Sequence, residues 1–517
     1  MKRDILINAG ARETRVAILE DDQLVELLVE RPDSRRMVGD IYLGKVEAVL
    51  PGIQAAFVNI GTEKAAFLHA SDLVYDEGGD PEEPDDDDDS DESSSRASKR
   101  RAAAPSIEEV LKKGQDLLVQ VSKEPISTKG PRVTAQISLA GRFIVYMPSA
   151  SRVGVSRKIS DREERRRLKE LVGAVLPDDA GGVIVRTVGE DASQETFGRE
   201  LNTLINTWKR IKRKNRFMRA PAQIHRETNL TRGLVRDLFS DKVDSLVVDS
   251  RTVHDEIIEY LKGVAPELAD RVKVYEESVP LFDKWNIETE IRDLFKRRCD
   301  LPSGGYLIIE PTEALVSIDV NSGRFVGKKD PEKTILKTNV EAAREVARQL
   351  RLRDVGGIIV CEFIDMESQA NRDRVLQELR NHLTRDRART KEFAVSDLRL
   401  IEMTRQRVRQ SHLQSMTAPC PTCSGTGRIF TPETIVRRME RSVKRMASEG
   451  RRENLIVRLH PETALHVLTE EQDLIRKLEK SVGFSLELRD DPLLKPDEFK
   501  LVVKGAGRDV TQQYAVA

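Results

Sequence analysis

The stretch from Ser317 to Met366 decides the fold: it opens with Ser-Ile-Asp-Val-Asn-Ser (317–322) and closes with Ile-Val-Cys-Glu-Phe-Ile-Asp-Met (359–366). Between these segments, apolar residues recur at three- to four-residue steps from Ile335 to Leu350, a period that predicts an amphipathic helix. A pair of glycines then ends that pattern and leads into a second apolar run. We therefore predict a strand, a helix and a second strand, in this order.

Acidic side chains lie near the ends of both apolar runs. Asp319 follows the first run, and Glu362, with Asp365 as the alternative, follows the second. Two strand ends can bring carboxylates that are distant in the sequence together at one edge of a sheet, where a hard divalent cation can bind. A single Asp in such a place is more often a turn or helix-capping residue. The choice between these interpretations depends on the rest of the chain.

Length and composition limit the class of protein. The 517 residues predict three or four domains, and a chain with 33% charged and 4% aromatic residues is polar but still able to form cores. No apolar run reaches the roughly 18–20 residues of a membrane span, and the N-terminus lacks the apolar region of a signal peptide. Four cysteines in so long a chain do not make a disulfide framework. We expect a cytoplasmic protein with no transmembrane segment.

The net charge of −1 hides an asymmetry along the chain. Residues 76–92 carry twelve Asp and Glu and no Lys or Arg, so the rest of the chain is basic. Residues 76–105 as a whole are of low complexity, which predicts a disordered insertion. A basic body points to a polyanionic partner such as nucleic acid, although ordinary surface charge is the alternative.

Residues 36–140 predict a small β-barrel that contains this insertion. Short alternating strands separated by glycine turns run from Gly39 to Asp72 and resume after the insertion. Phe57 and Phe67, on neighbouring strands, are placed to form a base-stacking platform, and Lys129 is placed to reach a backbone phosphate. Each Phe is explained equally well as a core residue.

Flanking segments predict a discontinuous α/β domain. Residues 1–35 contain two or three strands, too few for a domain, and residues 230–292 alternate helix and strand. We predict that the two segments share one sheet and that the barrel region is an insertion between them.

Residues 141–229 contain Gly182-Val-Ile-Val-Arg186-Thr187, an Arg-Thr pair at the end of an apolar strand. Such a pair offers a guanidinium fork, a hydroxyl and backbone N–H groups to a phosphate, and a surface ion pair is the alternative. A highly basic helix is predicted at residues 208–216.

Cys420-Pro-Thr-Cys423, followed by Ser-Gly-Thr-Gly, matches one half of a zinc knuckle. Zinc needs four ligands, and Cys299 and Cys361 lie in unrelated parts of the chain. One resolution is that two chains each supply a pair and share one Zn²⁺ in a homo-oligomer. A thioredoxin-like redox motif is the alternative, but it requires a helix after the first cysteine, which the glycines disfavour.

Several segments together resemble the ribonuclease E/G family, in the same order from residue 1 to about residue 430. They are Phe57-Val-Asn-Ile-Gly, Val185-Arg-Thr, Ile318-Asp-Val-Asn-Ser, Arg348-Gln-Leu-Arg-Leu-Arg-Asp-Val-Gly-Gly357, Phe363-Ile-Asp-Met and Cys420-Pro-Thr-Cys-Ser-Gly-Thr-Gly. The chain ends where ribonuclease E would continue into a long disordered scaffold. The resemblance is therefore to ribonuclease G or to a catalytic-half-only ribonuclease E, with no extended scaffold tail.

This resemblance implies a multidomain fold of α/β and β domains. They would be an RNase H-like domain (1–35 and 230–292), an S1 (OB-fold) RNA-binding barrel (36–140), a 5′-sensor (141–229), a DNase I-like catalytic domain (293–410), a zinc link (411–430) and a small α+β dimerisation domain (431–517). The implied activity is a metal-dependent, single-strand-specific endoribonuclease that cuts A/U-rich RNA to 5′-phosphate and 3′-hydroxyl ends. A 5′-monophosphate would stimulate it, and its duties would be rRNA and tRNA processing and mRNA decay.

The resemblance also assigns site residues. Asp319 falls on the first metal-binding aspartate, and Asn321 on the asparagine that supports the site. The remaining assignments are Phe57, Phe67 and Lys129 to RNA, Gly141, Val145, Arg186, Thr187 and Arg389 to the 5′-phosphate pocket, and Cys420 and Cys423 to zinc.

Position 362 departs from the family. The second metal ligand there is the first acid of Asp-Phe-Ile-Asp-Met, and this chain has Glu362. The added methylene changes coordination geometry, so Mn²⁺ is the alternative to Mg²⁺, and Asp365, which matches the family, is a candidate to compensate. An RNA-binding scaffold with an impaired nuclease site is the alternative function.

Overall fold

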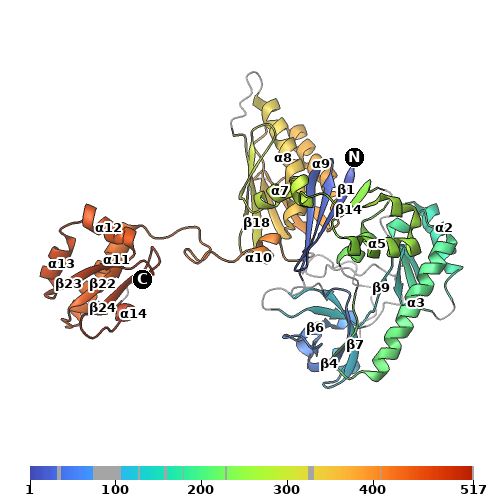
Figure 1. The fold of residues 1–517 in the computed structure, drawn as a ribbon, viewed down its shortest axis with the longest axis horizontal. Coiled ribbons are helices and arrows are strands. Elements are labelled where there is room, and N and C mark those ends of the chain that lie inside the picture. The colour runs from blue at the N-terminus through green and yellow to red at the C-terminus, as the bar shows by residue number, and fades with distance from the viewer. Residues whose placement is uncertain are drawn as a thin grey trace. The chain divides into compact units, whose positions relative to one another are not determined.

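The computed structural model describes residues 1–31, 37–73, 106–125, 129–156, 159, 161–177, 180–227, 230–240, 242–323, 331–396, 398–407 and 409–514. The chain divides into two compact units, Met1–Ser415 and Met416–Ala517 (Figure 1). The predicted acidic insertion lies outside the described residues. Among the helices that the structure describes, none is long and apolar enough to cross a lipid bilayer.

Two distant segments build the first sheet of unit 1, in the order β15-β14-β1-β2-β3. β1 pairs in parallel with β14, with Leu6 opposite Val247, and both strands are buried because cores lie on the two faces of this sheet. Residues 1–35 and 230–292 thus contribute strands to one sheet. The bounds are β1 Arg3–Ala9, β2 Thr14–Glu20, β3 Gln23–Glu30, β14 Ser245–Val248, β15 Val272–Val274, α4 Leu230–Asp237, α5 Arg251–Val264, α6 Leu281–Lys284 and α7 Ile287–Asp293.

A closed five-stranded barrel follows in the chain, which confirms the barrel predicted from the sequence. Its strands pair in the order β4-β5-β6-β8-β7, and β4 also pairs with β7, which closes the ring. Gly44 is required on β4, because a Cβ there would lie 2.5 Å from Val58 Cγ1 inside the barrel. The bounds are β4 Ile41–Leu50, β5 Ala55–Asn59, β6 Ala66–His69, α1 Ile107–Val110, β7 Asp116–Lys123 and β8 Arg132–Thr134.

A four-stranded sheet in the order β11-β12-β10-β9 follows the barrel. α2 and α3 pack on it through Leu168, Phe197 and Leu201, and α2 begins at Asp161, whose side chain accepts a hydrogen bond from Glu163 N. The next strand, β13, returns to the barrel and pairs with β4. The bounds are β9 Leu139–Ala140, β10 Ile144–Met147, β11 Val153–Val155, α2 Arg162–Gly173, β12 Gly182–Val185, α3 Gln194–Phe217 and β13 Ala222–His225.

A six-stranded sheet carries the stretch that decides the fold, in the order β16-β17-β18-β19-β21-β20. β18, α8 and β19 form the predicted strand, helix and strand, and β18 and β19 are parallel. Figure 1 shows α8 and α9 side by side next to this sheet, and their apolar faces bury Ile318, Val320 and Cys361. The bounds are β16 Arg298–Asp300, β17 Tyr306–Pro311, β18 Leu315–Asn321, α8 Pro331–Arg353, β19 Gly357–Glu362, α9 Gln369–Leu383, β20 Thr390–Glu392, β21 Leu400–Arg405 and α10 His412–Met416.

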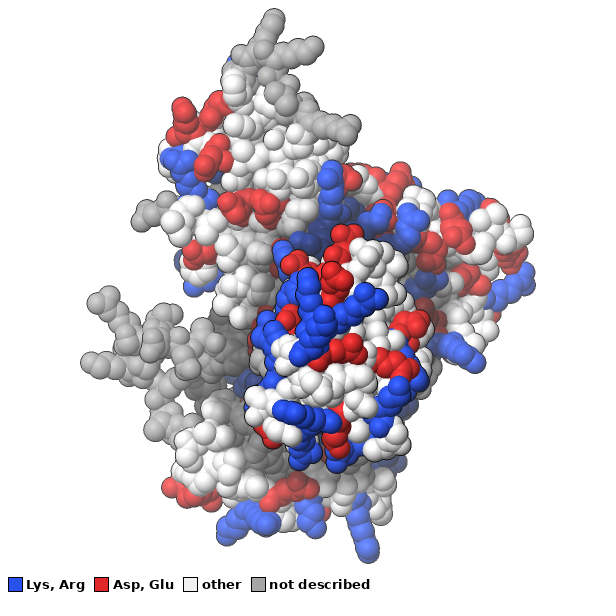
Figure 2. Space-filling model, turned by 90° about the vertical axis from the view of Figure 1, so that its left-hand side faces the viewer, with Lys and Arg blue, Asp and Glu red and all other residues white. Residues whose placement is uncertain are grey.

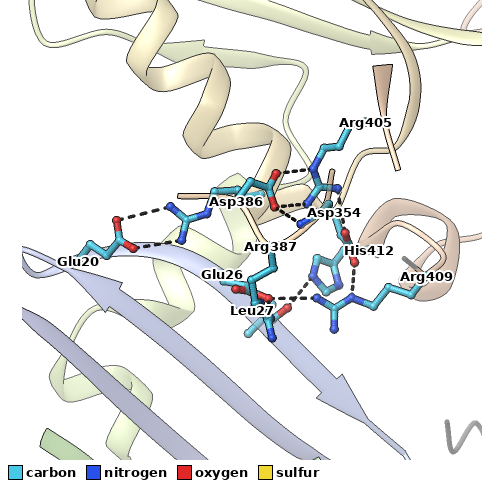
Figure 3. A network of polar contacts seen from close by, with 11 residues as sticks. Glu20, Glu26, Leu27, Asp354, Asp386, Arg387, Arg405, Arg409 and His412 are labelled. Atoms are coloured by element: carbon cyan, nitrogen blue, oxygen red, sulfur yellow. Dashed lines mark hydrogen bonds and ion pairs between the residues drawn. The ribbon is translucent and has the colours of Figure 1, made fainter. Parts of the chain in front are cut away.

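Buried ion pairs join the first sheet to the six-stranded sheet (Figure 3). Arg405 donates to Asp386 Oδ2 (2.6 Å) and to Asp354 Oδ1 (3.1 Å), and Arg409 pairs with both Asp354 and Glu26 of β3. Burial disfavours the Asp354 carboxylate, but the guanidinium groups of Arg409 and Arg405 outweigh it and hold its pKa below the usual value. On the face that Figure 2 shows, basic and acidic side chains are intermixed.

Unit 2 is a small α+β body with its own core. Its sheet has the order β23-β22-β24, and Leu455, Val457 and Leu459 of β22 are fully buried. Helix α11 begins at Thr431, whose side chain accepts a hydrogen bond from Thr434 N. The bounds are α11 Pro432–Ser448, β22 Leu455–Leu459, α12 Pro461–Glu470, α13 Leu474–Val482, β23 Leu486–Asp490, β24 Phe499–Val503 and α14 Thr511–Tyr514.

Candidate active site

Asp319 and Glu362 are direct neighbours on adjacent parallel strands. Asp319 of β18 is in register with Glu362 of β19, so the two side chains leave the same face of the sheet. Both are exposed, whereas Ile318, Val320 and Cys361 between them face the helices. Adjacent strands lie ~4.8 Å apart, which is close enough for two carboxylates to share one cation. The sequence placed both acids at strand ends, and the pairing of the strands brings them together.

No Lys or Arg in the described part of the chain forms an ion pair with Asp319 or Glu362. Among the described residues, the Asp319 carboxylate contacts Asn321, whose Nδ2 donates to Oδ2 at 2.7 Å. Two carboxylates and an amide suit a hard cation, and Mg²⁺ usually takes only one or two protein carboxylates and keeps water or phosphate in its other positions. Nowhere in the described residues do three or more His, Cys, Asp or Glu side chains gather to hold a metal. The donor set therefore fits Mg²⁺ or Mn²⁺ with an open coordination sphere.

A buried asparagine holds the loop that follows Glu362. Asn339 of α8 is fully buried, its Nδ2 donates to Ile364 O (2.7 Å), and its Oδ1 accepts from Ile364 N (3.1 Å). The same loop carries Asp365, which pairs with Arg399 at 3.0 Å. Sequence reasoning missed Asn339, although a polar residue within the apolar stripe of α8 was a signal. Asp365 is thus paired with a basic side chain, whereas Asp319 and Glu362 have no such partner in the part of the chain that the structure describes.

The Phe pair of the barrel is assembled as the sequence predicted. Phe57 and Phe67 are opposite each other on β5 and β6, their ring centroids are 6.1 Å apart, and their planes meet at 70°. Both rings are half-buried. Lys129 is exposed and precedes Gly130, which approaches Ala65 so closely that a Cβ would lie 2.1 Å from its carbonyl oxygen. The chain at Lys129 therefore runs beside the start of β6.

The residues assigned to a 5′-phosphate pocket are only partly together. Arg186 donates to Gly141 O (2.8 Å) and pairs with Asp237 at 2.6 Å, while Val145 lies on β10, next to β12. Thr187 follows Arg186 and is exposed. Arg389, by contrast, directly precedes β20 in the six-stranded sheet and is also exposed. Nη1 of Arg186 donates to both Gly141 O and Asp237, so part of the guanidinium that would bind a phosphate is already engaged.

Cys420 and Cys423 lie in a tight turn of unit 2. Gly427 N donates to Cys423 Sγ at 3.3 Å, and the backbone N–H groups of Cys423 and Thr422 lower the pKa of Cys420. Ser424 and Gly425 have positive φ, +52° and +93°, which the turn requires. Backbone donors that favour thiolate suit a zinc knuckle, and the two sulfurs supply half of a tetrahedral site.

The other two cysteines are unsuited to metal binding. Burial raises the pKa of the Cys361 thiol to about 12. The Cys299 thiol donates to Glu345 Oε1 at 3.2 Å, and burial followed by the charge of Glu345 raises its pKa to about 12 as well. Both thiols stay protonated, as buried packing residues do.

Comparisons with known proteins match nearly the whole chain. Residues 138–408 match the family model "Ribonuclease E/G family", and residues 419–504 match "RNase E/G, Thioredoxin-like domain". The chain is 37% identical to Ribonuclease G of Salmonella typhimurium over 506 residues, 97% of this chain and 100% of that protein. It is 38% identical to Ribonuclease G of Haemophilus influenzae over 97% of this chain and 99% of that protein. It is 41% identical to Ribonuclease E of a Nostoc species over 80% of this chain and 57% of that protein. The chain belongs to the ribonuclease E/G family.

Proposed function

We propose that this protein is a metal-dependent endoribonuclease that hydrolyses single-stranded, A/U-rich RNA in RNA processing and decay. The observation that carries the proposal is the in-register pairing of Asp319 and Glu362, two carboxylates without a basic partner in the described part of the chain. Relatives that align over nearly their whole length are named Ribonuclease G, which supports the same activity.

Each residue of the proposed active site has a separate role. Asp319 and Glu362 would hold Mg²⁺, or Mn²⁺ as the alternative, which when bound would polarise the scissile phosphate and make a water more acidic. Hydrolysis in which the 3′-oxygen is the leaving group gives the 5′-phosphate and 3′-hydroxyl ends that we propose. Asn321 orients the Asp319 carboxylate through its 2.7 Å hydrogen bond. Asn339 keeps the Glu362 loop in place from behind the sheet.

The barrel supports a preference for single-stranded RNA. Phe57 and Phe67 present a half-buried edge-to-face pair on which unstacked bases can stack, and Lys129 would meet the backbone. Bases in an A-form duplex are stacked on each other and unavailable to such a platform. We propose that the barrel, an S1-type OB-fold, presents single-stranded RNA to the six-stranded sheet, the DNase I-like catalytic domain.

A 5′-monophosphate would bind at Arg186 and Thr187, near Gly141 and Val145, with Arg389 from the catalytic domain. Asp237 pairs with Nη1 of Arg186, so a terminal phosphate would bind the remaining donors of the guanidinium, and its second negative charge favours it over an internal phosphate. Arg186→Ala should therefore remove the advantage of a 5′-monophosphate over a 5′-hydroxyl. An unchanged ratio of cleavage rates would refute this sensor role.

The turn at Cys420 and Cys423 supports a shared zinc link between two chains. Each chain would supply two thiolates, so we expect about one Zn²⁺ per two chains. Cys420→Ser should yield monomers in light scattering. A ratio of one Zn²⁺ per chain would contradict sharing. The remaining parts of the architecture that we propose are an RNase H-like first domain, a 5′-sensor at 141–229 and a small dimerisation domain at 431–517.

The decisive test is cleavage of an A/U-rich oligonucleotide by the wild type and by Asp319→Asn, with Mg²⁺ and Mn²⁺ compared. We expect cleavage only by the wild type, because the variant loses a charged ligand but keeps the shape of the side chain. Equal cleavage rates for the wild type and Asp319→Asn would contradict the assignment of Asp319 to the active site. If the wild type binds RNA without cleaving it and Glu362→Asp restores cleavage, the protein is an RNA-binding scaffold with an impaired site.

A further inference from the structure

The C-terminal end of α3 carries a run of cations without an acidic residue. Each of the seven Lys and Arg between residues 209 and 219 is exposed, while Ile211 on the same helix is buried. We name the following residues the α3 basic end: Lys209, Arg210, Lys212, Arg213, Lys214, Arg216 and Arg219.

None of these seven side chains forms an ion pair within the described residues. Lys214 donates instead to the carbonyl oxygens of Gln223 (3.2 Å) and Ile224 (2.9 Å), and Arg210 donates to Thr207 Oγ1 (3.2 Å). The basic helix α11 is different, because its Arg437 and Lys444 both pair with Glu440. The α3 basic end thus has no cation in an ion pair among the described residues, whereas two of the five cations of α11 are paired.

Such a run weakens its own helix. Lys209 and Arg213 are four residues apart, and Arg213 and Arg216 three apart, so these cations are neighbours on one side of the helix and repel each other. The helix dipole compensates only the last turn. A polyanion bound along this side would remove the repulsion.

An exposed aromatic ring accompanies the cations. Phe217, the last residue of α3, is 81% exposed, and Met218 after it is 41% exposed. A large ring in water among cations suits a partner that offers both negative charge and flat apolar faces. Single-stranded RNA has this composition, since phosphates alternate with bases that stack on aromatic side chains.

The α3 basic end is fixed to the barrel. Strand β13 begins a few residues after Phe217 and pairs with β4, with Ala222 opposite Leu43. Lys214 ties the helix to the same strand through its two carbonyl contacts. Figure 1 shows the end of α3 beside the barrel strands, and β4 in turn pairs with β5, which carries Phe57.

We propose that the α3 basic end is a second RNA-binding surface, which holds the phosphate backbone of RNA that extends beyond the Phe57–Phe67 platform, with Phe217 stacking on a base. The proposal rests on the proposed function in taking RNA as the substrate. It predicts that long RNA is bound more tightly than RNA that fills only the barrel.

The test replaces three cations on one side of the helix, in K209Q/R213Q/R216Q, in the full-length protein. Binding of labelled long and short A/U-rich oligonucleotides is measured by fluorescence anisotropy without added Mg²⁺ or Mn²⁺, so that cleavage plays no part and the zinc link is left intact. Affinity for the long RNA should fall about tenfold, and the slope of log affinity against log salt should fall by about 2, at ~0.7 for each lost phosphate contact on a single strand. F217A should weaken binding by a smaller factor without changing the salt slope.

The matched control is R476Q/K477Q/K480Q, which removes three exposed cations from α13. It should leave RNA affinity unchanged, and an equal loss in both triple variants would overturn the proposal, because only total charge would then matter. Loss of binding to vesicles that contain phosphatidylglycerol, with RNA affinity retained, would also overturn it in favour of a membrane. If the wild type fails to cleave RNA but K209Q/R213Q/R216Q still binds it more weakly, the proposed function fails and this surface stands.

Discussion

Carboxylates occur in two settings around the six-stranded sheet. Asp354 and Asp386 are buried on its helix side, and both bind the guanidinium of Arg405. Asp319 and Glu362 lie on the opposite, exposed face, next to each other and with no basic partner among the described residues. Carboxylates that are saturated by arginine stabilise the fold, whereas a pair left without a cation is prepared to bind one. The two settings should therefore respond in opposite ways to substitution.

Arg405→Ala should have the largest effect, and on stability alone. It leaves Asp354 and Asp386 buried without their shared cation, which typically costs about 3–5 kcal/mol. The melting temperature, followed by circular dichroism, should fall steeply. Arg407→Ala is the matched control, since Arg407 is exposed and its hydrogen bond within the described residues goes to a backbone oxygen, Gly356 O. Its melting temperature should stay close to that of the wild type. Equal melting temperatures for the two variants would contradict a structural role for the network.

Asn321→Ala should have the converse effect, on activity rather than stability. Losing the hydrogen bond that orients Asp319 should lower kcat/KM by roughly 10- to 100-fold, the usual cost of removing a group that positions a metal ligand. The melting temperature should not change, because Asn321 is only half-buried. If Asn321→Ala cleaves RNA at the wild-type rate, Asn321 has no role in the active site.

Acid should weaken the network and leave the fold less stable. Burial raises the pKa of Glu20, but Arg351 and Arg3 outweigh it and lower the pKa, as the arginines do for Asp354. In the folded protein both pKa values are below the values of about 4 that these carboxyls have in the unfolded chain. The stability that the ionised carboxylates contribute is therefore fully present above pH ~4 and is lost as the pH falls through the folded-state pKa values. The melting temperature of the wild type should decrease as the pH is lowered past ~4. In Asp354→Asn this decrease should be less steep. Parallel curves would show that other carboxylates cause the drop.

Glu362→Asp should have the smallest effect. The carboxylate stays in register with Asp319 but is one methylene shorter, so the ratio of Mg²⁺- to Mn²⁺-supported cleavage should change by a few-fold, in favour of the smaller and stricter Mg²⁺. Titration of both ions against cleavage rate measures this. An unchanged ratio would mean that the length of the Glu362 side chain does not set the metal preference.

The local pattern of apolar residues was sufficient to predict many of the strands and helices. The alternation of apolar residues predicted the barrel, and the strand, helix and strand from Ser317 to Met366 appear as β18, α8 and β19. The end of α8 differs in one respect. The helix ends at Arg353, and Asp354 takes the left-handed conformation (φ +52°) before the two glycines are reached. Ion pairs to Arg405 and Arg409 hold Asp354 there, and these partners are more than fifty residues away in the chain.

The sequence by itself determined which elements form and which acids end the strands, because strand and helix periods and glycine turns depend on neighbouring residues. Only the tertiary structure decided that Asp319 and Glu362 share one face in register, that Arg186 pairs with Asp237, and that Asn339 holds the loop after Glu362. Strand register and buried hydrogen bonds join residues that are distant along the chain, so no local pattern can specify them. The α3 basic end is a similar case: its charge is evident from the sequence, but only the fold shows that its cations have no acidic partner among the described residues.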